Sequence, residues 1–172
     1  MKCLILRRRT LTVLACALLA AMFALVNAPA VAEASATDRQ LPIYCVQRDQ
    51  KMLAISFDAA WGNEDTQQLI DILGKYNVKA TFFVVGDWVD KYPESVKALH
   101  DAGHEVMNHS NSHAHMSQLS SEAIVADVEA CNDKIEAVTG VRPTLIRPPY
   151  GEYDNNVITS IRSIGMEPIQ WD

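Results

Sequence analysis

Short apolar runs alternate with longer amphipathic segments along most of this chain, and this alternation restricts its fold more than any other feature. A run at 52–57 has the pattern of a buried strand, and 66–76 carries apolar residues at helical spacing. Further strands are expected at 79–85, 104–107, 144–146 and 166–170, and further helices begin near 92, 120 and 155. Repeated βα units predict an α/β fold, a parallel sheet or barrel with its active site at the carboxyl ends of the strands.

The first 34 residues have the pattern of an export signal. Four basic residues within 2–9 precede an apolar stretch, 11–26, and small residues suited to cleavage follow up to Ala34. A membrane span takes about 20 apolar residues, so we expect a cleaved signal peptide, with an uncleaved N-terminal anchor as the alternative. Either way the rest of the chain is expected to be extracytoplasmic. A polar lead-in segment, 35–50, then separates this leader from one domain at 51–172.

The charge of the chain argues against a nucleic acid as its partner. The net charge is −6, and four of the 15 Lys and Arg residues lie in the leader. Without them eleven basic residues stand against 21 acidic ones, which would repel a phosphate backbone. Membrane contact is therefore expected only through an uncleaved leader, and no pattern indicates a protein partner.

The four cysteines do not have the spacing of a metal site. Cys3 and Cys16 lie in the leader, and Cys45 and Cys131 are 86 residues apart. An oxidising compartment permits a disulfide between the latter two, but the pattern does not require one. Two separately buried thiols are the favoured interpretation.

All five histidines lie within one segment, between His100 and His115. His109 and His113 are four residues apart, so one helical turn would place both imidazoles on the same face, ready to bind one divalent metal ion. The alternative is a pair of exposed loop histidines, which are common. We expect His104 and His100 to be structural, and the role of His115 stays open.

Two charged residues follow predicted strands, where a parallel fold places its active site. Asp58 ends the first strand and is a candidate catalytic carboxylate, although an Asp at this place often caps a turn. Arg147 begins the run Arg147-Pro148-Pro149-Tyr150-Gly151, whose prolines fix the backbone and whose Arg could pair with a carboxylate. A plain proline-rich turn is the alternative.

The segments that carry these residues occur in an order known from one family. They are Ala54–Asp58, Lys79–Gly86, Gly103–His113 and Arg147–Gly151. In this order, and over about Leu41 to Asp172, the chain resembles the polysaccharide deacetylase family, also called the NodB-homology or carbohydrate esterase 4 group. Within it the chain resembles the sporulation-associated branch typified by PdaB.

The resemblance implies an incomplete, distorted (β/α) barrel that binds one divalent metal ion, typically zinc, and removes N-acetyl groups from amino sugars. The metal ligands would be His109 and His113, the general base Asp58, and the residue that orients the base Arg147. The backbone N–H of Tyr150 would hold the oxyanion. The implied substrate is an N-acetylated glycan, most plausibly peptidoglycan or a spore-wall polymer.

The chain departs from the family pattern at Ala59. The family carries a second Asp there, which is the third metal ligand, and a methyl group cannot bind a metal ion. We expect a lower metal affinity unless Glu64, Asp65 or His115 replaces that ligand.

The second departure concerns the carboxyl end. Family members continue into a further motif with a His that serves as general acid, whereas this sequence stops at Asp172, just after an apolar strand. A parallel strand is normally buried on both faces, so we expect the domain to be truncated at its C-terminus and its last strand to form an open apolar edge.

Three functional hypotheses follow. The first is an extracytoplasmic, metal-dependent polysaccharide N-deacetylase, a hydrolase of carbon–nitrogen bonds. The second is a catalytically weak or inactive relative that binds glycan or supports spore-wall assembly, and the third is a non-functional gene fragment.

Overall fold

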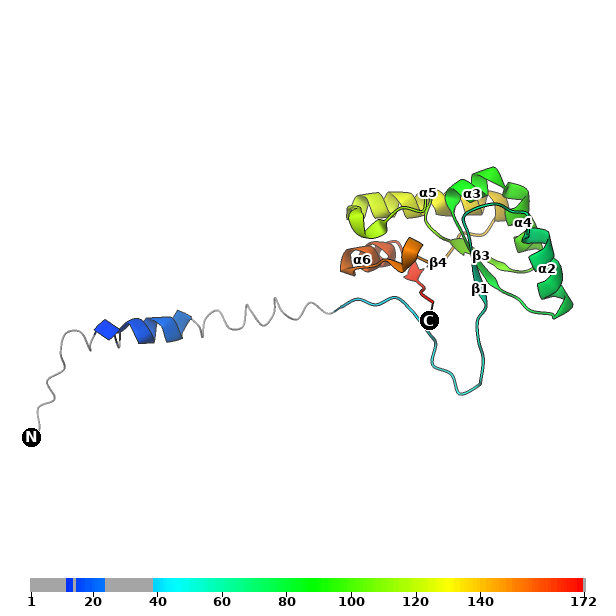
Figure 1. Ribbon diagram of the computed structural model, residues 1–172. Helices are drawn as coiled ribbons and strands as arrows, with labels where there is room; N and C mark the ends of the chain where they lie inside the picture. The colour runs from blue at the N-terminus through cyan, green and yellow to red at the C-terminus, as the bar shows by residue number, and fades with distance from the viewer. Residues whose placement is uncertain (1–11, 14, 24–38, 172) are drawn as a thin grey trace, which may run out of the picture. The chain divides into compact units, whose positions relative to one another are not determined.

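The computed structural model describes residues 12–13, 15–23 and 39–171, and the chain divides into two units, Met1–Arg39 and Gln40–Asp172 (Figure 1). In the first unit, residues 12–13 and 15–23 are helical and exposed. Within the described ranges no helix is long and apolar enough to cross a membrane. Most of the expected leader, with the small residues before Ala34, lies outside those ranges.

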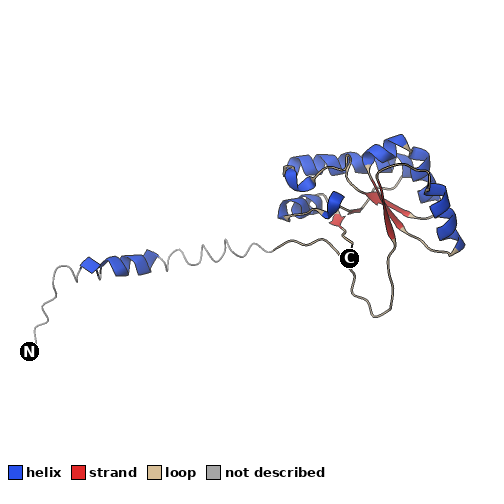
Figure 2. Ribbon diagram, in the orientation of Figure 1, coloured by secondary structure: helices blue, strands red, loops and turns tan. Residues whose placement is uncertain are grey.

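The second unit is built on one sheet of five parallel strands (Figure 2). They are β1 (Ser56–Ala59), β2 (Thr81–Val84), β3 (Glu105–Asn108), β4 (Leu145–Ile146) and β5 (Glu167–Pro168). The strands follow one another across the sheet in chain order. A doubly wound sheet would reverse its order at a switch point, whereas this order is that of successive strands around a (β/α) barrel. The predicted α/β fold, a distorted barrel with parallel strands, is confirmed.

Five helices of this unit lie along the strands (Figure 2). They are α2 (Thr66–Lys75), α3 (Gly86–Lys91), α4 (Pro93–Asp101), α5 (Ser121–Thr139) and α6 (Asn155–Ser163). Four of them were predicted within a residue or two, because proline at a first helical position and glycine after the last turn mark helix ends. Helix α3 was not predicted, since six residues are too few to show a helical period.

Helix α5 shows how the sequence fixes an element. Its N-cap Ser120 accepts a hydrogen bond from the Ala123 N–H, and Gly140 ends it in a left-handed conformation with φ 74°. The predicted apolar face is buried against the sheet, with Ile124 and Val128 fully inaccessible. Burial of such side chains contributes about 1.5–3 kcal/mol each, so the apolar face holds this helix in place.

The two cysteines of the second unit differ in environment. Cys131 lies on α5, and its thiol contacts the Val84 carbonyl of β2. Burial there raises the pKa of this thiol to about 12. Cys45 is free and exposed, so the expectation of two buried thiols is right for Cys131 and wrong for Cys45. Cys45 lies in an extended segment, 40–48, that packs few of its side chains against the sheet.

The lead-in segment also covers the outer edge of β5. Ile43 pairs in parallel with Ile169, donating its N–H to the Pro168 carbonyl and accepting from the Gln170 N–H, each at 2.8 Å. Arg162 of α6 fastens the same segment through the side chain of Gln40. The expectation of an open apolar edge at 166–170 is therefore wrong, because residues before the first strand return to pair there.

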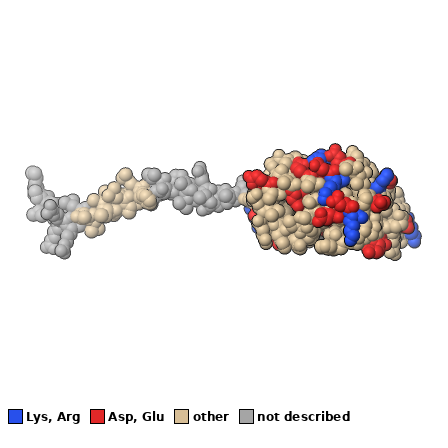
Figure 3. Space-filling model, turned by 90° about the horizontal axis from the view of Figure 1, so that it is seen from above, with Lys and Arg blue, Asp and Glu red and all other residues tan. Residues whose placement is uncertain are grey.

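Acidic and basic side chains are interspersed on the face shown in Figure 3. Lys134 of α5 pairs with Asp90 at 2.6 Å, and Arg142, which follows the helix, pairs with Asp133 and Glu136 of α5 at 2.9 and 2.6 Å. Ion pairs this exposed contribute about 0–1 kcal/mol each, so they add little to stability.

Candidate active site

The register of the sheet brings the predicted residues together. Ala59, Val84, Asn108 and Ile146 are paired in one row across β1 to β4. Asp58 precedes the first of these residues, and His109 and Arg147 directly follow the third and fourth. The carboxyl ends of three strands therefore supply a carboxylate, an imidazole and a guanidinium to one place, as sequence order and strand direction predicted.

The Arg147 side chain is buried and forms an ion pair with Asp58. Its Nη1 donates to Asp58 Oδ1 and its Nη2 donates to Ser56 Oγ, both at 2.7 Å. The guanidinium also lies 4.2 Å from the centroid of the Phe83 ring. Only 5% of Arg147 is exposed, so this planar group has one fixed position, and it contacts Asp58 through Oδ1.

The His109 imidazole lies between Asp58 and the backbone of Arg147. Its Nδ1 is 2.6 Å from the Arg147 carbonyl oxygen, which can only accept, so Nδ1 carries the proton. Its Nε2 is 4.0 Å from Asp58 Oδ2. Burial lowers the pKa of His109, although the nearby Asp58 opposes this shift. The ring is therefore neutral at pH 7 with a free lone pair on Nε2, the state in which imidazole binds a metal ion.

The His113 ring meets His109 edge-on, with centroids 5.0 Å apart and planes at 75°. The expected helical turn is absent, because residues 109–115 form an irregular loop. Ser110 and His113 have φ values of 71° and 56°, which cost about 1–2 kcal/mol each in residues with a Cβ. The pairing of the two imidazoles is as predicted, but the spacing of four residues acts through a strained loop and not through a helix.

These residues fit a divalent metal ion in part. His113 Nδ1 is buried and has no hydrogen-bond partner among the described residues, and His109 Nε2 is free, so two nitrogen donors are available. Catalytic zinc usually has three protein ligands. Within 39–171 no group of three His, Cys, Asp or Glu side chains could hold a metal ion, so Glu64, Asp65 and His115 do not complete the set. Ala59, where the resemblance implies a third ligand, offers only a methyl group.

Tyr150 lies on the turn that follows β4. The short helix η2 (Pro149–Gly151) contains Tyr150 with φ 60°, and the ring is about half exposed. His113 contacts this ring edge-on at 4.5 Å, and His115 stacks on it at 4.1 Å with planes 8° apart. His115 in turn bonds through Nδ1 to Glu152 Oε2 at 3.0 Å. The role of His115 visible here is to support Tyr150 at the rim of the site.

A small cavity of about 140 Å³ opens beside Asp58 and Ala59, and Trp61 and Trp88 also line it. The buried Trp88 donates its indole N–H to the Gly62 carbonyl at 2.6 Å and so fixes the loop after β1. Trp61 is 82% exposed, 6.0 Å from the His113 ring. The cavity gives access to the carboxylate from the side of β1.

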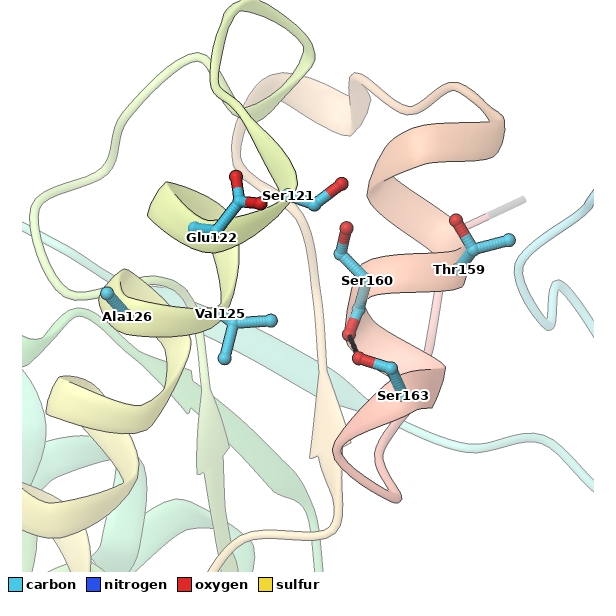
Figure 4. Close-up of a pocket in the computed structure, with 7 residues that line it drawn as sticks. All are labelled: Ser121, Glu122, Val125, Ala126, Thr159, Ser160 and Ser163. Atoms are coloured by element: carbon cyan, nitrogen blue, oxygen red, sulfur yellow. Dashed lines mark hydrogen bonds between the residues drawn. The ribbon is translucent and has the colours of Figure 1, made fainter.

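A larger groove, about 550 Å³, lies between α5 and α6 (Figure 4). Small side chains such as Ser121, Val125 and Ser160 line it, and none of the predicted site residues does. It is therefore separate from the cluster around Asp58.

Sequence reasoning missed Ser56, Asp127 and Glu152. Ser56 could have been found, because it lies two residues before Asp58 on the same strand and so points to the same face. Asp127 on α5 binds the Asn111 N–H, and Glu152 binds His115, over 16 and 37 residues of sequence, and no local pattern marks such contacts.

Comparison with known proteins places the chain in a family. Residues 46–169 match the model of the family described as polysaccharide deacetylase. The chain is 37% identical to the uncharacterized protein YlxY of Bacillus subtilis over 130 residues, 76% of this chain and 41% of YlxY. It is 38% identical to the peptidoglycan-N-acetylmuramic acid deacetylase PdaC of the same organism over 74% of this chain and 27% of PdaC. The chain thus spans less than half the length of these curated relatives.

Solved structures give the same result. BA3943 of Bacillus anthracis, a CE4 family pseudoenzyme, matches with a TM-score of 0.73 and 37% identity over 76% of this chain and 47% of that one. A BA3943 mutant with restored enzymatic activity matches equally well, at 38% identity over 76% and 48%. PdaC of Bacillus subtilis matches with a TM-score of 0.65 and 39% identity over 74% and 61%. The chain belongs to the polysaccharide deacetylase family, carbohydrate esterase 4, which acts on acetylated glycans and includes both peptidoglycan deacetylases and a pseudoenzyme.

Proposed function

We propose that the chain is a metal-dependent hydrolase that removes N-acetyl groups from an N-acetylated cell-wall or spore-wall polysaccharide similar to peptidoglycan. One observation carries the proposal: Arg147 holds Asp58 with its Oδ2 free and 4.0 Å from His109 Nε2, with the His113 ring next to it. A free carboxylate oxygen beside two imidazoles is the arrangement that metal-assisted hydrolysis of an amide needs.

Each residue has a separate task in this reaction. His109 and His113 would hold the divalent ion, typically zinc in this family, which when bound polarises the acetamide carbonyl and lowers the pKa of water. Asp58 accepts the proton of the attacking water on Oδ2, because Arg147 already occupies Oδ1. Arg147 orients that carboxylate, and the Tyr150 N–H donates to the oxyanion. The proton that Asp58 accepted passes to the amide nitrogen as the C–N bond breaks, which gives acetate and a free amine.

The second candidate is a weak or inactive member that binds glycan or supports wall assembly. Ala59 favours it, because the described residues supply two metal ligands where a catalytic zinc site usually has three. Its similarity to a pseudoenzyme also supports this candidate.

The location of the reaction follows from the N-terminal sequence. We propose a signal peptide or anchor at 1–34, a lead-in at 35–50 and a deacetylase domain at 51–172, in the sporulation-associated branch of the family. The basic and apolar pattern of the leader supports an extracytoplasmic protein, and the names of relatives such as PdaC support a wall substrate. The partner is then an N-acetylated glycan and no nucleic acid, with membrane contact only through the leader.

Release of acetate from N-acetylated peptidoglycan, measured with and without added zinc, tests this function. The proposed enzyme releases acetate only when zinc is present, and Asp58→Asn lowers the rate by about 10²–10⁴ while leaving zinc bound. Glycan binding without acetate release at saturating zinc would establish the second candidate instead. Loss of zinc in Asp58→Asn would make Asp58 a ligand and not the base.

A further inference from the structure

The loop that joins the two imidazoles needs support from its surroundings. Ser110 and His113 both have left-handed backbone conformations, which residues with a Cβ keep only where neighbouring contacts impose them. In this conformation of the loop the ring of His113 meets that of His109 edge-on. The contacts that impose it therefore decide whether the two nitrogen donors meet.

One side of the loop is held by the start of α3. The backbone N–H groups of Gly86 and Asp87 donate to the carbonyls of Ser110 and Asn111 at 3.0 and 2.9 Å. These donors belong to the first helical turn, which has no partners within its own helix. The approach is so close that a Cβ on Gly86 would lie 2.3 Å from the side-chain oxygen of Asn111.

The other side of the loop is held by the carboxylate of Asp127 on α5. Asp127 Oδ1 accepts from the Asn111 N–H at 2.9 Å, and Oδ2 accepts from the Ser112 hydroxyl at 3.2 Å. These two residues directly precede His113. Among the described residues both hydrogen bonds of this carboxylate go to the loop, whereas α5 itself is held by its buried apolar face.

We infer that Asp127 is a positioning residue, which fixes residues 111–112 so that the His113 ring lies opposite His109. A carboxylate suits this task because it accepts two hydrogen bonds at once, and bonds to an ionised acceptor are stronger than neutral ones. The effect on the ring concerns the protein without metal. Only its consequence for metal binding rests on the proposed function.

Two substitutions at this position and one elsewhere on α5 separate positioning from general stability. Asp127→Ala removes both acceptors, while Asp127→Asn keeps one acceptor for Asn111 and can donate its amide to Ser112. Asp133→Ala is the matched control, since it removes an exposed carboxylate from the same helix without touching the loop. Circular dichroism of the full chain first verifies that all three variants are folded.

The first measurement uses the metal-free protein. We expect Asp127→Ala to shift the His113 ring signals in NMR spectra, because the edge-on contact with Tyr150 is lost, and to speed amide exchange at Asn111 by about tenfold or more. Asp127→Asn and Asp133→Ala should keep the His113 ring signals and the Asn111 exchange rate of the parent. Unchanged ring signals and exchange in Asp127→Ala would overturn the inference.

The second measurement is the zinc affinity by calorimetry. Supporting partners of metal ligands typically contribute 10–100-fold, so we expect a dissociation constant raised by about that factor in Asp127→Ala and nearly restored in Asp127→Asn. Equal affinity in Asp127→Ala and the parent would contradict the inference. If the parent binds no zinc while Asp127→Ala still displaces the ring, the proposed metal site fails and the positioning role stands.

Discussion

Asn108, the last residue of β3, makes the buried connection between the sheet, α5 and the histidine loop. Its side chain is fully buried, and its Nδ2 donates to the Val128 carbonyl at 2.9 Å and to Asn132 Oδ1 at 2.8 Å. Its Oδ1 accepts from the Ser110 N–H at 2.7 Å. Three such bonds contribute about 1 kcal/mol each, so Asn108→Ala should lower the free energy of unfolding by about 3 kcal/mol.

The same structure predicts the effect of a subtler change. Asn108→Asp keeps the acceptor for Ser110 but replaces both donors with an oxygen that faces the Val128 carbonyl and Asn132 Oδ1. We expect it to be at least as destabilising as Asn108→Ala, because a buried carboxylate without donors costs more than an apolar group.

Urea unfolding followed by circular dichroism measures both changes. Asn63→Ala is the control, since Asn63 is only partly buried and its side chain donates to Ser95 Oγ at 3.0 Å, so a loss below about 1 kcal/mol is expected there. A free energy of unfolding for Asn108→Ala within 1 kcal/mol of the parent would refute the claim that this network holds the loop.

Three further predictions concern separate parts of the unit. Single substitutions of His109 or His113 by Ala should abolish most zinc binding in calorimetry, and a near-normal zinc affinity in both variants would contradict their role as metal ligands. Gly151→Ala should lower thermal stability, because φ is 68° and the new Cβ would lie 2.9 Å from the Trp171 ring; an unchanged melting temperature would contradict this close approach. Burial lowers the pKa of His104, so below pH about 6.5 the unfolded state gains a proton that the folded state does not. The free energy of unfolding should therefore fall on acidification below that value, and it should depend less on pH in His104→Gln.

The sequence was sufficient to predict the strands, most of the helices and the side chains at the strand ends. Periodicity and caps locate the elements, and parallel strands necessarily gather their carboxyl ends at one edge, which is why Asp58, His109 and Arg147 could be grouped in advance. Helix α3 escaped prediction because it is short. The pairing of Ile43 with the edge of β5 was not predicted either, because pairing over more than 120 residues leaves no local pattern.

The geometry within the site was less predictable. A spacing of four between His109 and His113 is helical by default, but the hydrogen bonds of Asp127 and α3 impose a loop with left-handed residues instead. The tautomer of His109 depends on a carbonyl 38 residues away in sequence. Such features arise from tertiary contacts, which compete with local propensity and outweigh it here.

The zinc affinities of the parent and of Ala59→Asp, measured side by side by calorimetry, show whether Ala59 occupies an empty ligand position. Ala59 ends β1 beside Asp58 and lines the same cavity, so a carboxylate there would supply the missing third ligand next to two imidazoles. We predict that Ala59→Asp tightens zinc binding by on the order of tenfold or more, raises acetate release, and loses this gain when His113 is also changed to Ala. An affinity that Ala59→Asp leaves unchanged would contradict the account of a metal site lacking one ligand at this strand end.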